Sequence, residues 1–147
     1  MEVGKQIKET IIKETIYVSP TAKARPRFTV IGGRVRTYTP KKTRDAELMI
    51  RSHVLRVMEH GAFDEGVPLR LEATFYRDRP KSLPKRITMP VSRPDYDNYA
   101  KLLTDALETC VYKNDSQITT AWVKKRFGSP PRIELLIEVD STEERSG

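Results

Sequence analysis

The pattern of apolar and polar positions along the chain predicts four separate strands. Residues 9–18 are rich in β-branched and aromatic side chains, which favour an extended backbone. Residues 68–76 alternate apolar and polar side chains in the manner of a half-buried strand, and residues 132–140 repeat that alternation. A further stretch with apolar side chains at residues 117–127 is also typical of a strand. These segments together predict a β-sheet.

A hairpin and two helices lie between these strands. Residues 27–39 contain two β-type runs separated by Gly32-Gly33, and this pair is typical of a tight hairpin turn because glycine tolerates positive φ. Helical spacing of apolar positions runs through residues 41–60 and again through residues 98–110. Before the second helix, residues 77–94 hold four prolines and no apolar period, which predicts a long loop.

The order of these elements predicts the fold class. It indicates an α/β (α+β) fold in which about two main helices pack on a mixed β-sheet. The length of 147 residues suits a single small domain over residues 1–140, followed by a polar tail, residues 141–147, that we expect to be disordered. No apolar run reaches the roughly 20 residues of a membrane span, and the N-terminus has no signal-peptide core. With a single cysteine, Cys110, the chain suits a reducing compartment, so we expect a cytoplasmic protein.

Positive charge is concentrated in two stretches of the chain. The sequence has 27 Lys+Arg against 20 Asp+Glu, a formal net charge of +7. Residues 22–44 contain eight basic residues and no acidic one, and residues 77–93 contain six basic residues and Asp78. Such clusters bind phosphate backbones because each contact releases condensed counterions, although solvated loops without a partner are the alternative. On the nucleic-acid interpretation, the candidate DNA contacts are Lys23, Arg25, Arg27, Arg34, Arg36, Lys81, Lys85, Arg86 and Arg93.

The helix predicted at residues 98–110 separates charged from apolar side chains. At about 100° per residue, Asp97, Lys101, Asp105 and Glu108 fall within about 80° of arc, and the apolar side chains lie opposite. Asp97 is expected to cap the helix by accepting backbone hydrogen bonds that the first turn leaves unpaired. The simplest interpretation is a capped helix with a solvated ladder of charges.

A metal site is the second interpretation of the same acids. Asp95 and Asp97 are one residue apart and follow the basic loop, and Asp115 lies at the turn before the next strand. Mg²⁺ prefers oxygen ligands and takes a few carboxylates together with waters and substrate phosphate, and Mn²⁺ can substitute for it. Asp115 would reach back towards Asp95 and Asp97 if that strand pairs beside the start of the helix.

Five segments and one lysine carry a resemblance to a known family. They are Lys23-Ala24-Arg25-Pro26-Arg27-Phe28, Tyr38-Thr39-Pro40, Arg93-Pro94-Asp95-Tyr96-Asp97-Asn98, Ala106-Leu107, Asn114-Asp115-Ser116-Gln117-Ile118, and Lys101. Together they resemble the RusA family of Holliday-junction resolvases of bacteria and their phages. The resemblance covers about residues 16–139, and its N-terminal part is similar to the phage-type members.

The resemblance implies a small α/β enzyme that works as a homodimer on branched DNA, namely the four-way junction. Its catalytic acids would be Asp95, Asp97 and Asp115, which would also hold Mg²⁺. Lys101 would be the catalytic lysine, and Asp105 would have a supporting role. The implied activity is Mg²⁺-dependent, structure-selective hydrolysis of DNA phosphodiester bonds, which resolves Holliday junctions in recombination and repair. Two alternatives stay open: a non-catalytic nucleic-acid-binding accessory protein, and a nuclease for other branched DNA such as flaps.

Overall fold

The computed structural model describes residues 11–24, 27–59 and 61–141, and the elements in these ranges follow the predicted order. Arg25 and residues 142–147 of the predicted tail lie outside the described residues. Neither of the described helices has the length and apolarity that a bilayer crossing needs. The elements are the strands β1 (Ile11–Ile16), β2 (Arg27–Ile31), β3 (Arg34–Tyr38), β4 (Leu69–Arg77), β5 (Ile118–Phe127) and β6 (Arg132–Val139), the helices α2 (Lys41–Val57) and α3 (Tyr96–Leu107), and the 3-10 turn η1 (Asp115–Gln117).

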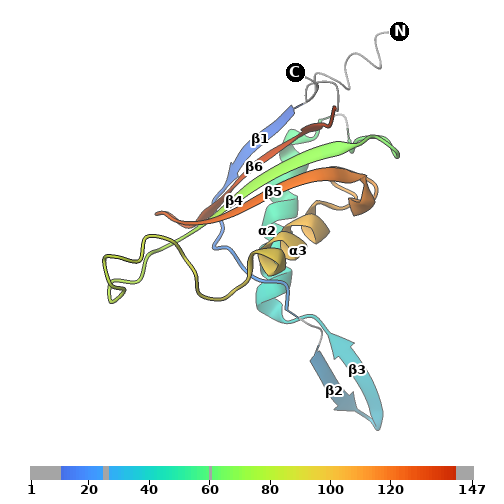
Figure 1. Ribbon diagram of the computed structural model, residues 1–147. Helices are drawn as coiled ribbons and strands as arrows, with labels where there is room; N and C mark the ends of the chain where they lie inside the picture. Colours follow the sequence, from blue (N-terminus) through green and yellow to red (C-terminus); the bar gives the residue numbers. More distant parts are fainter. Residues whose placement is uncertain (1–10, 25–26, 60, 142–147) are drawn as a thin grey trace.

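Four strands form the main sheet in the order β1-β6-β4-β5, which confirms the predicted mixed sheet. Strand β6 runs antiparallel to both β1 and β4, whereas β4 and β5 are parallel. Parallel neighbours need a crossover that returns the chain to the starting end of the sheet. Here the long loop after β4, then α3 and η1, form that crossover (Figure 1). Helix α3 therefore runs back along the sheet, from the end of β4 to the start of β5.

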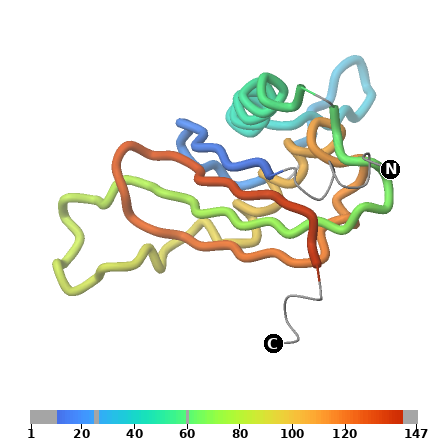
Figure 2. Tube along the Cα trace, turned by 90° about the horizontal axis from the view of Figure 1, so that it is seen from above, coloured from blue at the N-terminus to red at the C-terminus, as the bar shows by residue number. Residues whose placement is uncertain are grey.

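The core lies between the main sheet and the two helices, which pack against each other on one face of that sheet (Figures 1 and 2). The alternation predicted for β4 is confirmed, since Leu69, Leu71, Ala73 and Phe75 are all buried. The ring of Phe75 stacks on that of Tyr99 from α3, with 5.1 Å between their centroids. Packing of this kind fixes the rotation of α3 about its own axis.

The predicted apolar side of α3 is confirmed, but the predicted N-cap is wrong. The side chains of Tyr99, Leu102, Leu103, Ala106, Leu107 and Cys110 are each at most 2% exposed. The N-cap residue is Asp95, whose carbonyl oxygen accepts from the N–H of Tyr99, so the helix starts earlier than residue 98. Asp97 consequently lies in the first turn, and the Asp95 side chain makes no capping hydrogen bond. Both carboxylates are left available for other partners.

Strands β2 and β3 form a separate hairpin outside the main sheet (Figure 1). Its turn has φ values of +59° at Gly32 and +78° at Gly33, the left-handed conformation that the glycine pair predicted. Every residue of both strands is exposed. The hairpin therefore takes no stability from the core.

Arg51 ties α2 to the C-terminal end of α3. Its Nη1 donates to the carbonyl oxygens of Ala106 at 3.1 Å and Glu108 at 2.9 Å, and its Nη2 donates to Thr109 Oγ1 at 3.1 Å. The last carbonyls of a helix have no partner within the helix, and a cation there also complements the helix dipole. This contact holds the point where the chain leaves α3 for η1.

Candidate active site

Two carboxylates without a bound partner among the described residues lie at the start of α3, on its exposed side. Asp95 stands at the N-cap and Asp97 in the first turn, and both are exposed. Within the described ranges, neither side chain takes part in a hydrogen bond or an ion pair. Acidic groups are favoured near a helix N-terminus, where the unpaired N–H groups carry partial positive charge. The sequence thus holds two negative charges at one end of α3 without neutralising them.

Lys101 follows one turn later, and its ammonium is held by Asp105. Lys101 Nζ lies 3.1 Å from Asp105 Oδ1. That hydrogen bond and the charge of Asp105 raise the pKa of Lys101 above its ordinary value, against a small opposing effect of burial, and the charge of Asp115 adds to the increase. Lys101 is therefore a cation at neutral pH.

Asp115 is placed by the turn η1 on the C-terminal side of α3. The N–H of Asp115 donates to Glu108 Oε1 at 3.3 Å, and its carboxylate has no hydrogen-bond or ion-pair partner in the described part of the chain. The preceding residue caps the turn, because Asn114 Oδ1 accepts from the N–H of Ser116 at 2.9 Å. Asp115 lies close enough to Lys101 to influence the pKa of that lysine.

Gln117 anchors this turn with both ends of its buried amide. Its Oε1 accepts from the N–H groups of Lys113 and Asn114 at 3.0 and 3.1 Å. Its Nε2 donates to the carbonyls of Asp64 and Val67 at 2.9 and 3.1 Å. The amide thus uses both donors and both lone pairs. The sequence motif included Gln117 but did not predict that it anchors the turn. The local signal that could have indicated this role is the capping-box spacing from Asn114 to Gln117.

The structure does not bring Asp115 next to the start of α3. The start of β5 pairs with the start of β4, at Leu69 and Ile118, whereas Asp95 and Asp97 follow the end of β4. A crossover helix runs opposite to its strands, so η1 lies towards the far end of α3. In the described ranges no group of three acidic, histidine or cysteine side chains is gathered to hold a metal ion. The acids are instead spread along α3, with Lys101 between them.

The arginines of the hairpin share one of its two faces. Arg27 pairs with Tyr38, Thr29 with Arg36, and Ile31 with Arg34, and paired residues of an antiparallel ladder point to the same side. Alternation along each strand then places all three arginines on that face. All three are exposed, as a phosphate-binding surface requires. Arg25, also predicted to contact DNA, lies outside the described residues.

The predicted loop between β4 and α3 combines structural and exposed basic residues. Arg79 Nη2 donates to the carbonyls of Leu83, Pro84 and Ile87, and Arg77 donates to Ser92. These two arginines hold the shape of the loop. The remaining basic side chains are exposed and have no partner among the described residues: Lys81, Lys85, Arg86 and Arg93.

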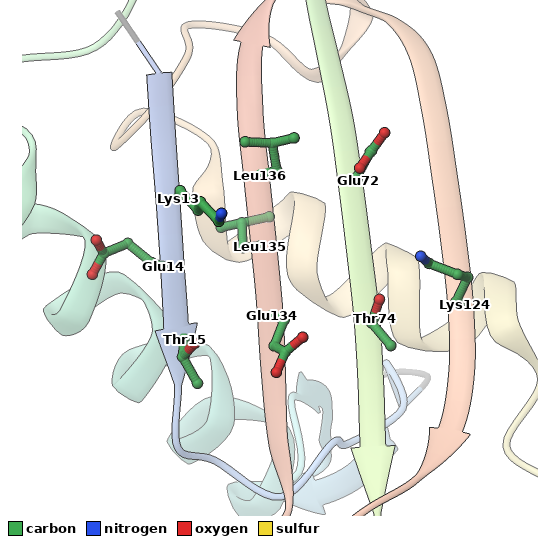
Figure 3. A pocket seen from close by; sticks show the side chains of 9 residues that line it. All are labelled: Lys13, Glu14, Thr15, Glu72, Thr74, Lys124, Glu134, Leu135 and Leu136. Atoms are coloured by element: carbon green, nitrogen blue, oxygen red, sulfur yellow. The ribbon is translucent and has the colours of Figure 1, made fainter.

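A hollow of about 610 Å³ lies over the main sheet and is separate from these acids (Figure 3). Its walls carry charges of both signs, which does not favour a phosphate, and they include none of Asp95, Asp97, Lys101 and Asp115. The lining residues are Lys13, Glu14, Thr15, Glu72, Thr74, Lys124, Glu134, Leu135 and Leu136.

Unpaired acids flanked by exposed basic segments, here the hairpin β2–β3 and the loop between β4 and α3, are typical of enzymes that act on nucleic acids. The chain matches the family model described as Endodeoxyribonuclease RusA over residues 18–138. It belongs to the RusA family of endodeoxyribonucleases, as the sequence motifs predicted. This membership confirms the predicted enzyme class and stands against the alternative of a non-catalytic binding protein.

Two relatives extend over most of the chain. The uncharacterized protein YqaN of Bacillus subtilis (strain 168) is 31% identical over 138 residues, which cover 86% of this chain and 94% of that protein. The crossover junction endodeoxyribonuclease rusA of Lactococcus phage r1t is 29% identical over 119 residues, which cover 80% and 88% of the two chains.

The anchoring role of Gln117 predicts a pH-dependent defect for Gln117→Glu. At pH 7.5 the new carboxylate places an oxygen against the carbonyls of Asp64 and Val67, so we expect the free energy of unfolding to fall by about 2–4 kcal/mol. At pH 4.5 a protonated carboxyl donates one hydrogen bond, and the loss relative to the parent chain should shrink. Urea denaturation at both pH values measures this. A loss that is the same at both would contradict the assigned hydrogen bonds.

Proposed function

We propose that the chain is a Mg²⁺-dependent, structure-selective endodeoxyribonuclease that resolves four-way DNA junctions in recombination and repair. The observation that carries the proposal is the pair of unpaired carboxylates at the start of α3, Asp95 and Asp97, with Lys101 one helical turn after Asp97. Membership of the RusA family supports cleavage of DNA. The printed name of the phage relative, crossover junction endodeoxyribonuclease, supports the junction as the substrate.

The available donors fit a hard divalent cation. Three carboxylates have no hydrogen-bond or ion-pair partner among the described residues, namely those of Asp95, Asp97 and Asp115. A ready-made cluster is not required, because Mg²⁺ usually keeps several waters and takes about one or two carboxylates together with substrate phosphate. Because Asp115 lies towards the other end of α3, Asp95 and Asp97 would hold one Mg²⁺ ion, or Mn²⁺ in its place, and Asp115 would hold a second. The bound ion supplies an acidified water and neutralises charge on the phosphoryl oxygens.

Lys101 contributes a positive charge between the acids at the two ends of α3. In hydrolysis a water oxygen forms a bond to phosphorus while the bond to the leaving sugar oxygen breaks, and negative charge builds on the oxygens. A preorganised ammonium stabilises that charge without having to reorient during the reaction. The ion pair with Asp105 provides the orientation, and the raised pKa keeps the proton on Lys101.

The exposed basic side chains hold the DNA backbone around this site. Phosphate contacts position a duplex without reading its sequence, which suits selection by structure. The residues proposed for this role are the hairpin arginines Arg27, Arg34 and Arg36, with Arg25 beside them in the sequence, and the loop residues Lys81, Lys85, Arg86 and Arg93.

A homodimer is the second part of the proposal, supported by the hairpin face opposite the arginines. An isolated two-stranded hairpin is at best marginally stable in water. On that face Phe28, Val30 and Val35 are 73%, 68% and 67% exposed. A second copy of the chain would cover these apolar side chains and leave the arginines facing DNA. Two-fold symmetry would also match the two-fold character of a four-way junction.

Asp97→Asn tests the acid site. This change removes a charge and keeps the side-chain volume, so we expect Mg²⁺-dependent nicking of a synthetic four-way junction to fall by at least about a hundredfold. Junction binding measured without metal should stay within about twofold of the parent value, since Asp97 makes no contact that holds the fold. The matched control is Asp78→Asn, which changes an exposed acid of the loop and should nick normally.

Undiminished nicking by Asp97→Asn would contradict the site assignment. The same assay compares a junction, a flap and a linear duplex with the parent chain. We expect the junction to be cut fastest; a flap cut at the same rate would favour the alternative of a general branched-DNA nuclease.

The two faces of the hairpin make opposite predictions for neighbouring substitutions. Val30→Asp places a charge on the apolar face and should convert a dimer to a monomer in sedimentation velocity. Thr29→Asp places the same charge among the arginines, so it should leave the dimer intact and weaken DNA binding. A monomeric parent chain, or a Val30→Asp variant that remains dimeric, would overturn the proposed interface.

A further inference from the structure

Lys23 occupies a position that its place in a basic segment did not indicate. Its Nζ lies 3.0 Å from Glu47 Oε2 of α2 and 3.3 Å from Asp105 Oδ2 of α3. Its backbone N–H donates to the carbonyl of Asn98 at 3.1 Å, in the first turn of α3. The Lys23 side chain is only 27% exposed. A lysine bound to two carboxylates in this way is poorly placed to bind a phosphate.

Asp105 is shared between two lysines. Its Oδ2 faces Lys23, and its Oδ1 lies 3.1 Å from Lys101 Nζ. The Asp105 side chain is 21% exposed, whereas that of Lys101 is 57% exposed. Lys23, Asp105 and Lys101 thus form a row of ion pairs in which Lys23 and Asp105 are partly buried and Lys101 is exposed to solvent. The orientation of the carboxylate decides where the Lys101 ammonium is held.

Glu47 completes the support from the opposite side. Burial lowers the pKa of Lys23, but hydrogen bonds and charges of Glu47 and Asp105 outweigh this effect and leave the pKa above its ordinary value. Lys23 therefore stays charged at neutral pH and can bridge α2 to α3. A bridge of this kind restricts the Asp105 side chain to one orientation, because rotation would break the contact at Oδ2.

From this geometry we infer that Lys23 is a positioning residue for Lys101, acting through Asp105. The inference rests on the proposed catalytic role of Lys101. Exposed lysine side chains have many rotamers, and ordering one costs conformational entropy. Lys23 lowers that cost by holding the carboxylate to which Lys101 is bound. Without Lys23, the Asp105 carboxylate can turn, and the Lys101 ammonium that is bound to it leaves its position.

The expected effect is on the rate of cutting rather than on DNA affinity. Misplacing a reacting group by about 1 Å costs up to about a hundredfold, so we expect Lys23→Met to slow single-turnover nicking of a four-way junction about ten- to hundredfold. The affinity and the slope of log K against log salt concentration should not change. Arg34→Met is the comparator: loss of one phosphate contact lowers that slope by about one.

A double-mutant cycle separates the positioning role from a general structural one. If Lys23 acts through Asp105, Lys23→Met should cost little further rate in an Asp105→Asn background. Lys23→Arg keeps the charge and should recover part of the rate. If Lys23→Met unfolds, as urea denaturation would show, the cycle is run with Lys23→Arg, whose smaller defect should likewise vanish in the Asp105→Asn background.

Three results would overturn the inference. A salt slope lowered by about one with an unchanged rate at saturating DNA would make Lys23 a phosphate contact. Rate losses that multiply in the double mutant would make its effect independent of Asp105, and a normal rate for Lys23→Met would remove the role altogether. Lys101→Met distinguishes a failure of the proposed function: if that variant nicks normally, Lys101 is not catalytic, whatever Lys23 does.

Discussion

The crossover between the parallel strands β4 and β5 is the constraint on which the site depends. Parallel neighbours require the chain to return across the sheet, and α3 makes that return with one side packed against β4. Its apolar side is almost completely buried, so the opposite side, with Asp97 and Lys101, faces solvent. The same crossover places Asp95 at one end of α3 and Asp115 beyond the other. The fold therefore distributes the acids along α3 and does not gather them at one end.

The acids around α3 fall into two groups, those paired with a lysine and those without a partner. Glu47 of α2 is paired with Lys23, and Asp105 of α3 is paired with both Lys23 and Lys101, so these two acids hold lysine side chains in place. The acids at the two ends of the crossover have no such partner among the described residues. Unpaired carboxylates repel the DNA backbone unless a cation lies between the carboxylates and the phosphates. The basic side chains of the hairpin and of the loop before α3 attract the same backbone. The proposed divalent cation would reconcile the two effects, because such an ion binds carboxylate and phosphate oxygens at the same time.

Features with a local period could be predicted from the sequence, and contacts between distant segments could not. The order of elements, the buried side of α3 and the turn at Gly32 and Gly33 all follow from spacing or from glycine chemistry. The N-cap was misplaced by one helical half-turn because Asp95 and Asp97 are both good capping residues. Lys23 was assigned to DNA since its neighbours are basic; its partners come from two helices that only the folded chain brings near. Gln117 likewise binds carbonyls from a different loop.

In the proposed site, acids of α3 would hold a metal ion against the phosphate that is cut. A four-way junction with one phosphorothioate at that position tests this metal contact, since sulfur is a poor ligand for the hard Mg²⁺ ion and a better one for the softer Mn²⁺ ion. For one of the two diastereomers, we expect nicking in Mg²⁺ to slow by at least about tenfold and to recover in Mn²⁺. Nicking that is equally slow in both ions, or that is unaffected by the sulfur in either diastereomer, would contradict a metal contact at this phosphate.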